Sequence, residues 1–368
     1  QEMSSLEPKS HIAALPLYPT GASRGTGTGT TIKLSSNESA FGPSPDAERV
    51  YRDLTPSLNR YPEAGDNELR AAIAEVHDIE PEGIFGSNGA DHVIYLLLST
   101  YAGPGDEVVV SQHGFFRNTL SVRACGATPV VANELDYTTS VDAMLAAVTD
   151  RTRVVLLANP NNPTGTYVST SDLQRLADGL PSNVLLIVDS AYAEYVRTPD
   201  YSAGMELVQR ADHVAMTRTF SKAYGLAGLR LAWAYGSRRI VDAYTRARLP
   251  YPVSRPAQAV GVAALRDRAH LERVVEQNAR GLVWVRERLD ALGLHPFSTV
   301  TNFNTCRFGP PGSGAATRAV AFLAARNILV RPLAPAGLPD FVRITVGLEE
   351  ENRALIDGVS AFLEADAS

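Results

Sequence analysis

The segment TFSKAYGLAGLR, residues 219–230, places a single lysine among hydroxyl residues, glycines and small apolar residues. Thr219 and Ser221 offer hydroxyl donors, and Lys222 offers an amine. Arg230 can bind an anion through two parallel hydrogen bonds if the glycine-bearing loop folds it back. Each side chain alone could be a solvated surface residue. Together, within twelve residues, they suit a phosphate site beside a reactive amine.

Two further segments carry polar side chains directly after an apolar run. In LLANPNNPTG the prolines and asparagines could form only a tight turn, but Asn162 could also present its amide to a ligand. In LLIVDSAYAEY, Asp189 could be only a helix cap, or it could hold a cationic ring nitrogen. The hydroxyl of Tyr192, three residues later, could reach the same ligand.

A fourth segment, FGSNGADHVIYLLL, places Gly89, Ala90 and Asp91 at the start of a predicted helix. Backbone N–H groups at a helix N-terminus bind phosphate without special side chains, and a glycine permits close approach. An N-capping turn is the plain alternative, and it is compatible with that role.

The elements that would position these residues form an α/β pattern over residues 42–248. Short apolar runs such as DEVVVSQ, ATPVVA, RVVLLANP, NVLLIVDS, HVAMTRT and LRLAWAYG alternate with helical stretches. This alternation predicts a large domain with a mostly parallel sheet covered on both faces. Because ligands of such sheets bind at the carboxyl ends of the strands, the four segments are expected to meet there.

Residues 249–368 follow a different order, which predicts a smaller α+β C-terminal domain. A long helical stretch, RPAQAVGVAALRDRAHLERVVEQNARGLVWVRERLDALG, precedes strands at NFNTCRF, ILVRPL and FVRITVG and a last helix. The chain breakers in LPYPVSRP mark the boundary. Residues 1–41 form an N-terminal segment in which Gly25, Gly27 and Gly29 are spaced GxGxG. That spacing does not match the dinucleotide fingerprint.

Composition excludes several classes of protein. The 368 residues carry 34 basic and 40 acidic side chains with no basic cluster, which does not favour a nucleic-acid partner. Two cysteines and no long apolar run predict a cytoplasmic protein without disulfides or a membrane span. The seven histidines are not spaced with cysteines or carboxylates as metal ligands are, so no metal is expected.

The motifs LSSNESAFGPSP, RYPEAGDNELRAAI, NGAD, NPNNPTG, VDSAYAEY, TFSKAYGLAGLR and FVRITVGLEEEN occur in this order along nearly the whole chain. In this set the sequence resembles the fold-type I aminotransferases that use pyridoxal 5′-phosphate, and most of all their histidinol-phosphate aminotransferase branch. NPNNPTG alone is moderately specific, whereas the ordered set is highly specific.

The resemblance implies a role for each strand end. Lys222 would hold the cofactor covalently and, once displaced by the substrate amine, act as base and acid for the proton shift. Asp189 would keep the pyridine nitrogen protonated, and Asn162 and Tyr192 would bind the ring's 3′ oxygen. The remaining cofactor contacts implied are Phe115, stacked on the ring, and Ala90, Asp91, Thr219, Ser221 and Arg230 around its phosphate. Tyr61 would reach the phosphate of the other subunit's cofactor, which implies a homodimer.

The resemblance also implies substrate contacts. Arg343 would grip the anionic end of the substrate, although as a bare sequence feature it could be an exposed strand residue. Arg331 resembles a second anion contact. Tyr18 and Asn37 lie where the branch brings its N-terminal segment over the substrate, so residues 1–41 would form an arm and lid packed on the small domain.

The sequence departs from the branch near the substrate. Ser190 replaces a glutamate, His113 and Gly114 replace the usual residues before the stacking ring, and APAGLPD follows RPL. His113 could contact substrate, but a lone histidine is more often structural. None of these changes removes a cofactor contact, so they bear on specificity and not on the class of reaction.

Four functions stay open from the sequence. The leading one is transfer of an amino group between L-histidinol phosphate, or a related aromatic amino acid, and 2-oxoglutarate or glutamate. The alternatives are an aminotransferase for phenylalanine, tyrosine or tryptophan, and a decarboxylase of a phosphorylated amino acid. A binding protein on the same scaffold would be expected to lack the lysine or the aspartate, and both Lys222 and Asp189 are present.

Overall fold

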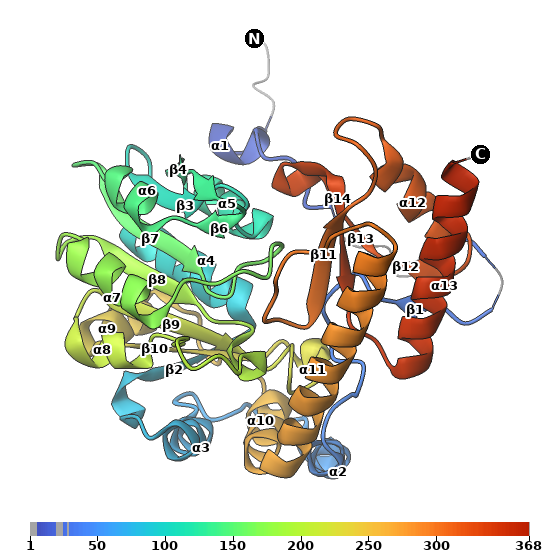
Figure 1. The fold of residues 1–368 in the computed structure, drawn as a ribbon. Coiled ribbons are helices and arrows are strands. Elements are labelled where there is room, and N and C mark those ends of the chain that lie inside the picture. Colours follow the sequence, from blue (N-terminus) through green and yellow to red (C-terminus); the bar gives the residue numbers. More distant parts are fainter. Residues whose placement is uncertain (1–5, 20–24, 28, 368) are drawn as a thin grey trace.

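The computed structural model describes residues 6–19, 25–27 and 29–367. The predicted arm, residues 1–41, therefore lies partly outside the described residues. Figure 1 shows two sheets side by side, the larger one on the left and the smaller one on the right. The prediction of a large, mostly parallel domain with a smaller α+β part is confirmed.

The large sheet has seven strands in the order β2-β10-β9-β8-β7-β3-β4. Only β10 runs antiparallel to its two neighbours, and every other pair is parallel. The strands are β2 (Ile84–Ser87), β3 (Glu107–Ser111), β4 (Thr128–Ala132), β7 (Thr152–Ala158), β8 (Leu185–Asp189), β9 (Val214–Thr219) and β10 (Ala232–Gly236). All of these strands except β2 are predicted from the sequence.

Helices cover both faces of this sheet, as the unbroken apolar runs of its strands require. Along β7, Val154 and Leu156 face one apolar cluster while Val155 and Leu157 face the other. The first cluster is covered by α4 (Ala90–Tyr101), α5 (Phe116–Ala124) and α9 (Arg238–Ala247). The second is covered by α2 (Pro45–Asp53), α3 (Asn67–His77), α6 (Val141–Ala146), α7 (Thr170–Gly179), α8 (Met205–Arg210) and α10 (Arg255–Arg266).

The small sheet is antiparallel in the order β11-β14-β13. Its strands are β11 (Phe303–Arg307), β13 (Arg331–Leu333) and β14 (Leu338–Thr345), and it packs with α11 (Arg268–Ala291), α12 (Ala315–Ala324) and α13 (Glu349–Asp366). The described part of the N-terminal segment adds β1 (Ile32–Lys33), which pairs in parallel with β12 (Ile328–Leu329). Leu34 is buried in the apolar cluster of the small sheet, so this part of the segment packs there.

The long helix predicted after residue 254 is divided in two by the structure. Helix α10 ends at Arg266, and the side chain of Asp267 then accepts a hydrogen bond from the backbone N–H of His270 at the start of α11. The sequence predicts one continuous helix here because apolar residues continue on both sides of Asp267. The structure shows instead that Asp267 caps a new helix. The break sends α10 onto α2 and α3, whereas α11 runs up along the small sheet (Figure 1).

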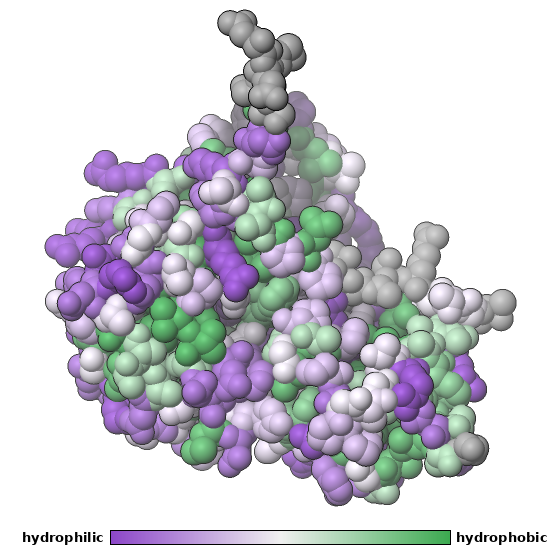
Figure 2. Space-filling model, turned by 90° about the horizontal axis from the view of Figure 1, so that it is seen from above, coloured by the Kyte–Doolittle hydropathy of each residue, from purple (hydrophilic) through white to green (hydrophobic). Residues whose placement is uncertain are grey.

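The remaining elements are short. They include helix α1 (Ser10–Ala13), the hairpin of β5 (Glu134–Leu135) and β6 (Thr138–Thr139), and single-turn 3-10 helices in the loops. In Figure 2, hydrophilic and apolar residues alternate on the face seen from above instead of gathering into one patch of a single kind. Among the described residues, none of the helices is both long and apolar enough to span a bilayer.

Candidate active site

The carboxyl ends of β7, β8 and β9 open onto one cavity of about 120 Å³, far more than the 10–15 Å³ that one water molecule needs. All the predicted cofactor-binding residues except Tyr61 line this cavity. They are Ala90, Asp91, Phe115, Asn162, Asp189, Tyr192, Thr219, Ser221, Lys222 and Arg230. The four segments singled out in the sequence therefore meet at the edge of the sheet where parallel strands place their ligands.

Lys222 stands in the turn that follows β9. The backbone N–H of Gly225 donates to the carbonyl of Lys222 at 3.0 Å, and a Cβ on Gly225 would lie 2.4 Å from the carbonyl oxygen of Gly42, so this turn requires a glycine. The lysine is half-buried, and its Nζ donates to the carbonyl of Ser36 at 3.2 Å. Burial, followed by the positive charge of Arg343, lowers the pKa of Lys222 to about 8. At pH 7 roughly a tenth of this amine is therefore unprotonated, far more than at the ordinary lysine pKa of 10.5, and the unprotonated form is the one a nucleophile or base requires.

Asp189 is the last residue of β8 and is buried. Its Oδ1 accepts a hydrogen bond of 3.3 Å from the hydroxyl of Thr217. Burial, and secondly the charge of Asp91, raises the pKa of Asp189 to about 6. A buried carboxylate with these neighbours is stabilised by a cation, so the site suits a protonated ring nitrogen at this point.

Part of the cavity wall is built to hold an anion. Helix α4 directs its N-terminal backbone N–H groups there, starting at Ala90. Arg230 donates to the hydroxyl of Ser221 at 3.4 Å and to the carbonyl of Ala227 at 3.1 Å, and it forms no ion pair with a carboxylate of the described chain. Gly89, with φ of +93°, makes room for it, because a Cβ there would lie 2.5 Å from Nη2 of Arg230. These groups fit the phosphate of the cofactor that the resemblance implies.

Tyr192 and Asn162 also line the cavity. The Asn37 side chain donates to the Tyr192 hydroxyl at 2.8 Å, and Asn37 is itself held by hydrogen bonds with Thr345 and Asn302. Burial raises the pKa of Tyr192 to about 12, so its hydroxyl keeps its proton and can donate it. The N-terminal segment thus contributes to the cavity by orienting a side chain of the large sheet.

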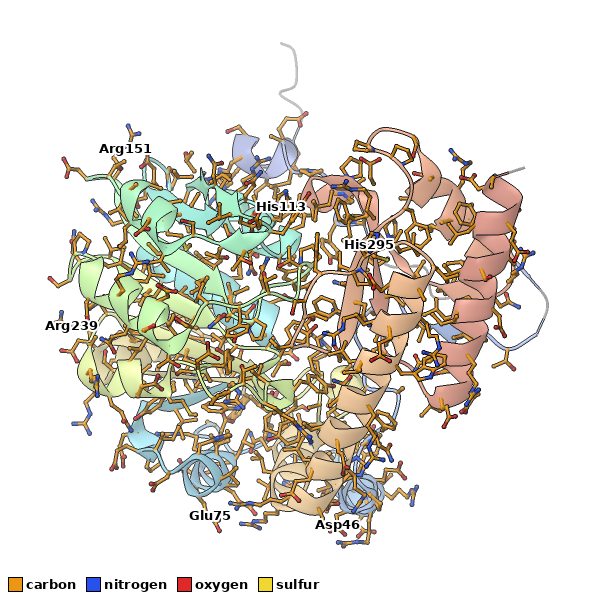
Figure 3. All side chains as sticks on the ribbon, viewed as in Figure 1. Asp46, Glu75, His113, Arg151, Arg239 and His295 are labelled. Atoms are coloured by element: carbon orange, nitrogen blue, oxygen red, sulfur yellow. The ribbon has the colours of Figure 1, made fainter. Side chains whose placement is uncertain are left out.

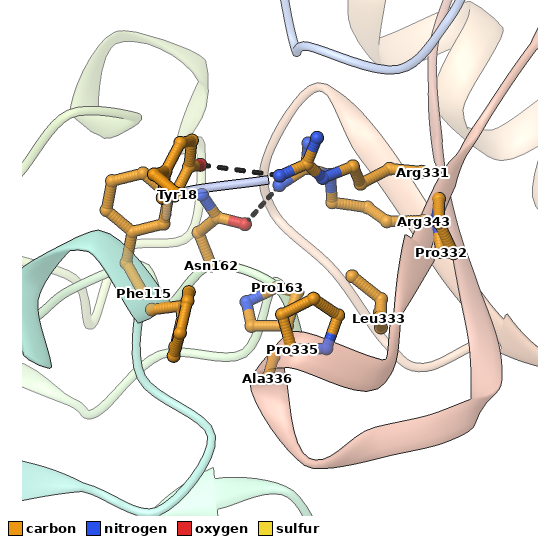
Figure 4. Close-up of a pocket in the computed structure, with 11 residues that line it drawn as sticks. Tyr18, Phe115, Asn162, Pro163, Arg331, Pro332, Leu333, Pro335, Ala336 and Arg343 are labelled. Atoms are coloured by element: carbon orange, nitrogen blue, oxygen red, sulfur yellow. Dashed lines mark hydrogen bonds between the residues drawn. The ribbon is translucent and has the colours of Figure 1, made fainter. Parts of the chain in front are cut away.

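Arg343, on β14, approaches the cavity from the small sheet. Its Nη1 donates to Oδ1 of Asn162 at 2.5 Å (Figure 4). Its Nη2 donates to the carbonyl of Ser35 at 2.9 Å. Its Nε is buried without a hydrogen-bond partner, and burial lowers the pKa of Arg343 to about 10. Within the described residues it has no carboxylate partner. A buried guanidinium in this state is a strong site for an incoming carboxylate or phosphate.

A second, smaller pocket adjoins the first and shares Phe115 and Asn162 with it. Figure 4 shows Arg331 and Tyr18 on its rim beside Arg343. Arg331 donates to the carbonyl of Pro19 at 2.6 Å and lies 3.5 Å from the Tyr18 hydroxyl. All four predicted substrate residues are thus at the cavities: Arg331, Arg343 and Tyr18 on the pocket wall, and Asn37 through its bond to Tyr192.

Tyr61 lies outside both cavities. It is 78% exposed, and its ring stacks on that of Tyr251 with 4.7 Å between centroids. It therefore has no part in the cavity of its own chain. Its predicted contact with the other subunit's cofactor stays a prediction.

Several polar residues near the site were not found from the sequence. Arg218 and Glu194 form a buried ion pair of 2.8 Å next to the ends of β8 and β9. A single arginine within the apolar run HVAMTRT was the available signal, because a buried charge needs a partner. Asn161 donates to the carbonyl of His113 and to the Thr164 hydroxyl, which fixes the turn before Asn162.

His113 does not line either cavity. Its Nδ1 pairs with Oε2 of Glu134 at 2.8 Å, and the two side chains are 12% and 1% exposed. Figure 3 shows His113 on the side of the large-sheet half that faces the small sheet, whereas Arg151, Arg239, Glu75 and Asp46 lie on the periphery. Within the part of the chain that the structure describes, no group of three or more histidine, cysteine or acidic side chains is arranged to hold a metal ion.

Comparison with known proteins gives consistent results. The family model for aminotransferase class I and II matches residues 30–359. The chain is 47% identical to a histidinol-phosphate aminotransferase of Dinoroseobacter shibae over 98% of this chain and 99% of that one. It is 44% identical to the one of Maricaulis maris over 98% of this chain and 100% of that one.

A solved structure is also similar over nearly the full length. The histidinol-phosphate aminotransferase from Sinorhizobium meliloti, in complex with pyridoxal-5′-phosphate, superposes with a TM-score of 0.90 at 26% identity. The match covers 99% of this chain and 100% of that one.

Proposed function

This chain belongs to the aminotransferase class I and II family, and from that premise we propose that it is a pyridoxal 5′-phosphate-dependent histidinol-phosphate aminotransferase. It would exchange an amino group between L-histidinol phosphate and 2-oxoglutarate or glutamate. The names of its relatives support this substrate, as does the arrangement of cationic groups around the cavity.

The residues of the cavity fit the cofactor at each of its reactive or charged points. Lys222 offers an amine of lowered pKa, Asp189 a carboxylate that favours a cation, and Arg230 with the α4 N-terminus an anion site. Phe115 lines both cavities and offers a ring for stacking. When bound, the cofactor supplies an aldehyde for the amine and a ring that withdraws electrons from the reacting carbon.

The side chains of the cavity would each have a separate role in the reaction. Lys222 would hold the cofactor before substrate arrives, and its amine, once freed, would serve as the base and acid for the proton shift. Asp189 would keep a proton on the ring nitrogen, because it supplies a negative charge in a buried place. Asn162 and Tyr192 would orient the ring through its oxygen. Burial of these groups excludes water from the reacting atoms.

The observation that carries the substrate assignment is the buried guanidinium of Arg343. It has one N–H without a partner and a second arginine, Arg331, on the same pocket wall. Two guanidinium groups suit the doubly charged phosphate of L-histidinol phosphate, which has no carboxylate. The α-carboxylate of glutamate would use Arg343 in the other half of the reaction.

Steady-state turnover with a panel of donors tests this proposal. With 2-oxoglutarate as acceptor, L-histidinol phosphate is expected to give a higher kcat/KM than phenylalanine, tyrosine or tryptophan. No turnover of L-histidinol phosphate would overturn the proposed substrate, and preferred turnover of the aromatic amino acids would assign the chain to them. Release of CO₂ from a phosphorylated amino acid, without amino transfer, would make it a decarboxylase.

The active unit is proposed to be a homodimer in which Tyr61 reaches the partner's cofactor phosphate. Support comes from the high exposure of Tyr61 and of other large apolar residues close to it in sequence or in space. These are Tyr51, Leu58, Leu249 and Tyr251. An exposed group of this kind is typical of a protein interface.

The division into residues 1–41, 42–248 and 249–368 also stays a proposal. The separate apolar clusters of the two sheets support two domains, and the burial of Leu34 supports an arm on the small one. Because α10 packs with α2 and α3, limited proteolysis should be compared at two places, near residue 248 and at the break between α10 and α11. A cytoplasmic location stays a prediction.

A further inference from the structure

The hairpin of β5 and β6 contains a residue whose backbone is unfavourable for its type. Its two turn residues, Asp136 and Tyr137, have φ of +48° and +60°. Hairpin turns of this kind favour asparagine or glycine, and a bulky residue with positive φ is uncommon. A tyrosine at this place therefore needs a compensating contact.

The contact is made by the small sheet. The Tyr137 ring lies 4.5 Å from the ring of Phe297 and 5.5 Å from that of Phe341, and these two rings are 5.2 Å apart. Tyr137 and Phe297 pack on a cluster of buried apolar residues that includes Phe341. The guanidinium of Arg307 lies over Phe341 and 3.4 Å from the Tyr137 hydroxyl. A residue of the large-sheet half is thus inserted among aromatic residues of the small-sheet half.

The other end of the hairpin is tied to the wall of the cavity. Glu134 accepts hydrogen bonds from the Ser111 hydroxyl at 2.7 Å and from the backbone N–H of His113 at 3.0 Å, and it pairs with the His113 ring. The loop that follows β3 contains His113 and continues directly into Phe115, which lines both cavities. The carbonyl of Tyr137 also accepts from Thr166 at 2.9 Å. The hairpin is therefore fixed to the large sheet on both sides of Tyr137.

On the small sheet, the contact lies close to the substrate arginines. Phe341 and Arg343 are two residues apart on β14, so their side chains point to the same face of the sheet. Arg331 is paired with Arg343 on the neighbouring strand. Any shift of the aromatic cluster relative to the hairpin would therefore move the anion-binding groups relative to Lys222.

We propose that Tyr137 is a positioning residue that sets the distance between the substrate arginines of the small sheet and the reactive lysine of the large sheet. The inference rests on the proposed function, since it assumes that one substrate is held by both sheets at once. Without the ring contacts, the small sheet would occupy the binding-competent arrangement for a smaller fraction of the time. The apparent affinity for substrate falls in proportion to the fraction of protein in that arrangement. Saturating substrate restores the arrangement, so kcat is unchanged.

The variant Tyr137→Gly separates this role from a role in the turn. Glycine relieves the positive φ, so a residue needed only for the turn would give unchanged kinetics and equal or higher stability. The variant loses two ring contacts with the small sheet and one with His113. This loss is expected instead to raise KM about tenfold for both the amino donor and the oxo acid. The kcat should stay within about twofold of wild type, and the visible absorption band of the holoenzyme should be kept.

Two variants serve as controls. Tyr137→Phe keeps the ring and should leave KM unchanged. If the hydroxyl carried the effect instead, this variant would raise KM. Asp136→Gly changes the other positive-φ residue of the same turn, whose side chain is exposed, and should leave KM unchanged. If Tyr137→Gly does not fold, Tyr137→Leu replaces it, because leucine keeps apolar volume without the ring.

The outcomes distinguish this inference from the proposed function. Wild-type KM in the ring-deleted variant, or a loss of kcat with KM unchanged, overturns the positioning role while the function stands. A wild-type protein that transfers no amino group from any donor overturns the function itself.

Discussion

At the scale of single residues, the cavity brings together a lysine and an aspartate whose pKa values are shifted toward each other. Burial lowers that of Lys222 to about 8 and raises that of Asp189 to about 6. Each shift opposes the charged form of the residue, so each is a cost to the protein without a ligand. A cofactor that takes up the amine and supplies a cation to the aspartate removes both costs, which is why these two residues mark a binding site.

The pKa of Lys222 gives a prediction for the protein after removal of its cofactor. The unprotonated amine is the form that attacks an aldehyde, so the initial rate of cofactor rebinding should rise with pH and level off above about 8. The measurement is the appearance of the visible absorption band after addition of pyridoxal 5′-phosphate. Because Arg343 lowers this pKa, Arg343→Gln should move the midpoint to higher pH.

Arg331→Gln is the matched control for that prediction, since Arg331 is not among the charges that act on Lys222. A midpoint near the ordinary lysine value of 10.5 in the wild type would contradict the desolvated amine.

Asp189→Asn should have opposite effects on stability and on activity. Because the pKa of Asp189 is raised in the folded protein, its ionisation lowers the free energy of unfolding. The loss is complete above about pH 6 and absent below about pH 3.8. Without cofactor at pH 7, the variant is therefore expected to be more stable by about 3 kcal/mol, and the difference should vanish as pH falls through this window. Its kcat/KM should fall at least 100-fold, because a neutral amide does not hold a proton on the ring nitrogen. Denaturant unfolding at several pH values checks the first part.

At the scale of elements, the site depends on how strands end and how the following turns fold back. The strand ends could be predicted because short apolar runs with polar residues after them are typical of buried parallel strands, and the strands found here are five to seven residues long. The break between α10 and α11 at Asp267 could not be predicted, because apolar residues continue at helical spacing on both sides of it. The arm's bond to Tyr192 and the Tyr137 hairpin depend on contacts between residues far apart in sequence, to which local patterns are insensitive.

A substitution at Gly89 tests the proposed phosphate site around Arg230. Gly89→Ala would bring a Cβ within 2.5 Å of Arg230 and put a non-glycine residue at φ of +93°. We expect the dissociation constant for pyridoxal 5′-phosphate to rise about tenfold or more, measured by equilibrium titration of the cofactor-free protein. Gly103→Ala, where a Cβ meets no atom within 4 Å and φ is not positive, should leave it unchanged. Equal affinities in both variants would show that the cofactor phosphate does not bind between Gly89 and Arg230.

At the scale of the whole molecule, the cavity of one chain lacks Tyr61, which is exposed elsewhere on the surface. If the residue acts on the partner's cofactor, two inactive variants should complement each other. A mixed dimer of Tyr61→Ala and Lys222→Ala chains has one site with both residues intact and one site with neither. It should therefore recover about half of wild-type activity per dimer, whereas each variant alone stays low.

Purified mixed dimers carrying two different tags allow this measurement. No recovery of activity in the mixed dimer, with recovery of the dimer itself confirmed by mass, would contradict a shared active site. A monomer in solution with full activity would do the same.

The central claim is that Lys222 and its cavity transfer an amino group from L-histidinol phosphate. Its most direct test is the half-reaction: mix the holoenzyme with this donor and no oxo acid, and follow the cofactor's absorption. We predict that the visible band of the lysine-bound cofactor is replaced by the shorter-wavelength band of the pyridoxamine form, and that 2-oxoglutarate restores it. A visible band that does not change with L-histidinol phosphate at any concentration would contradict the account.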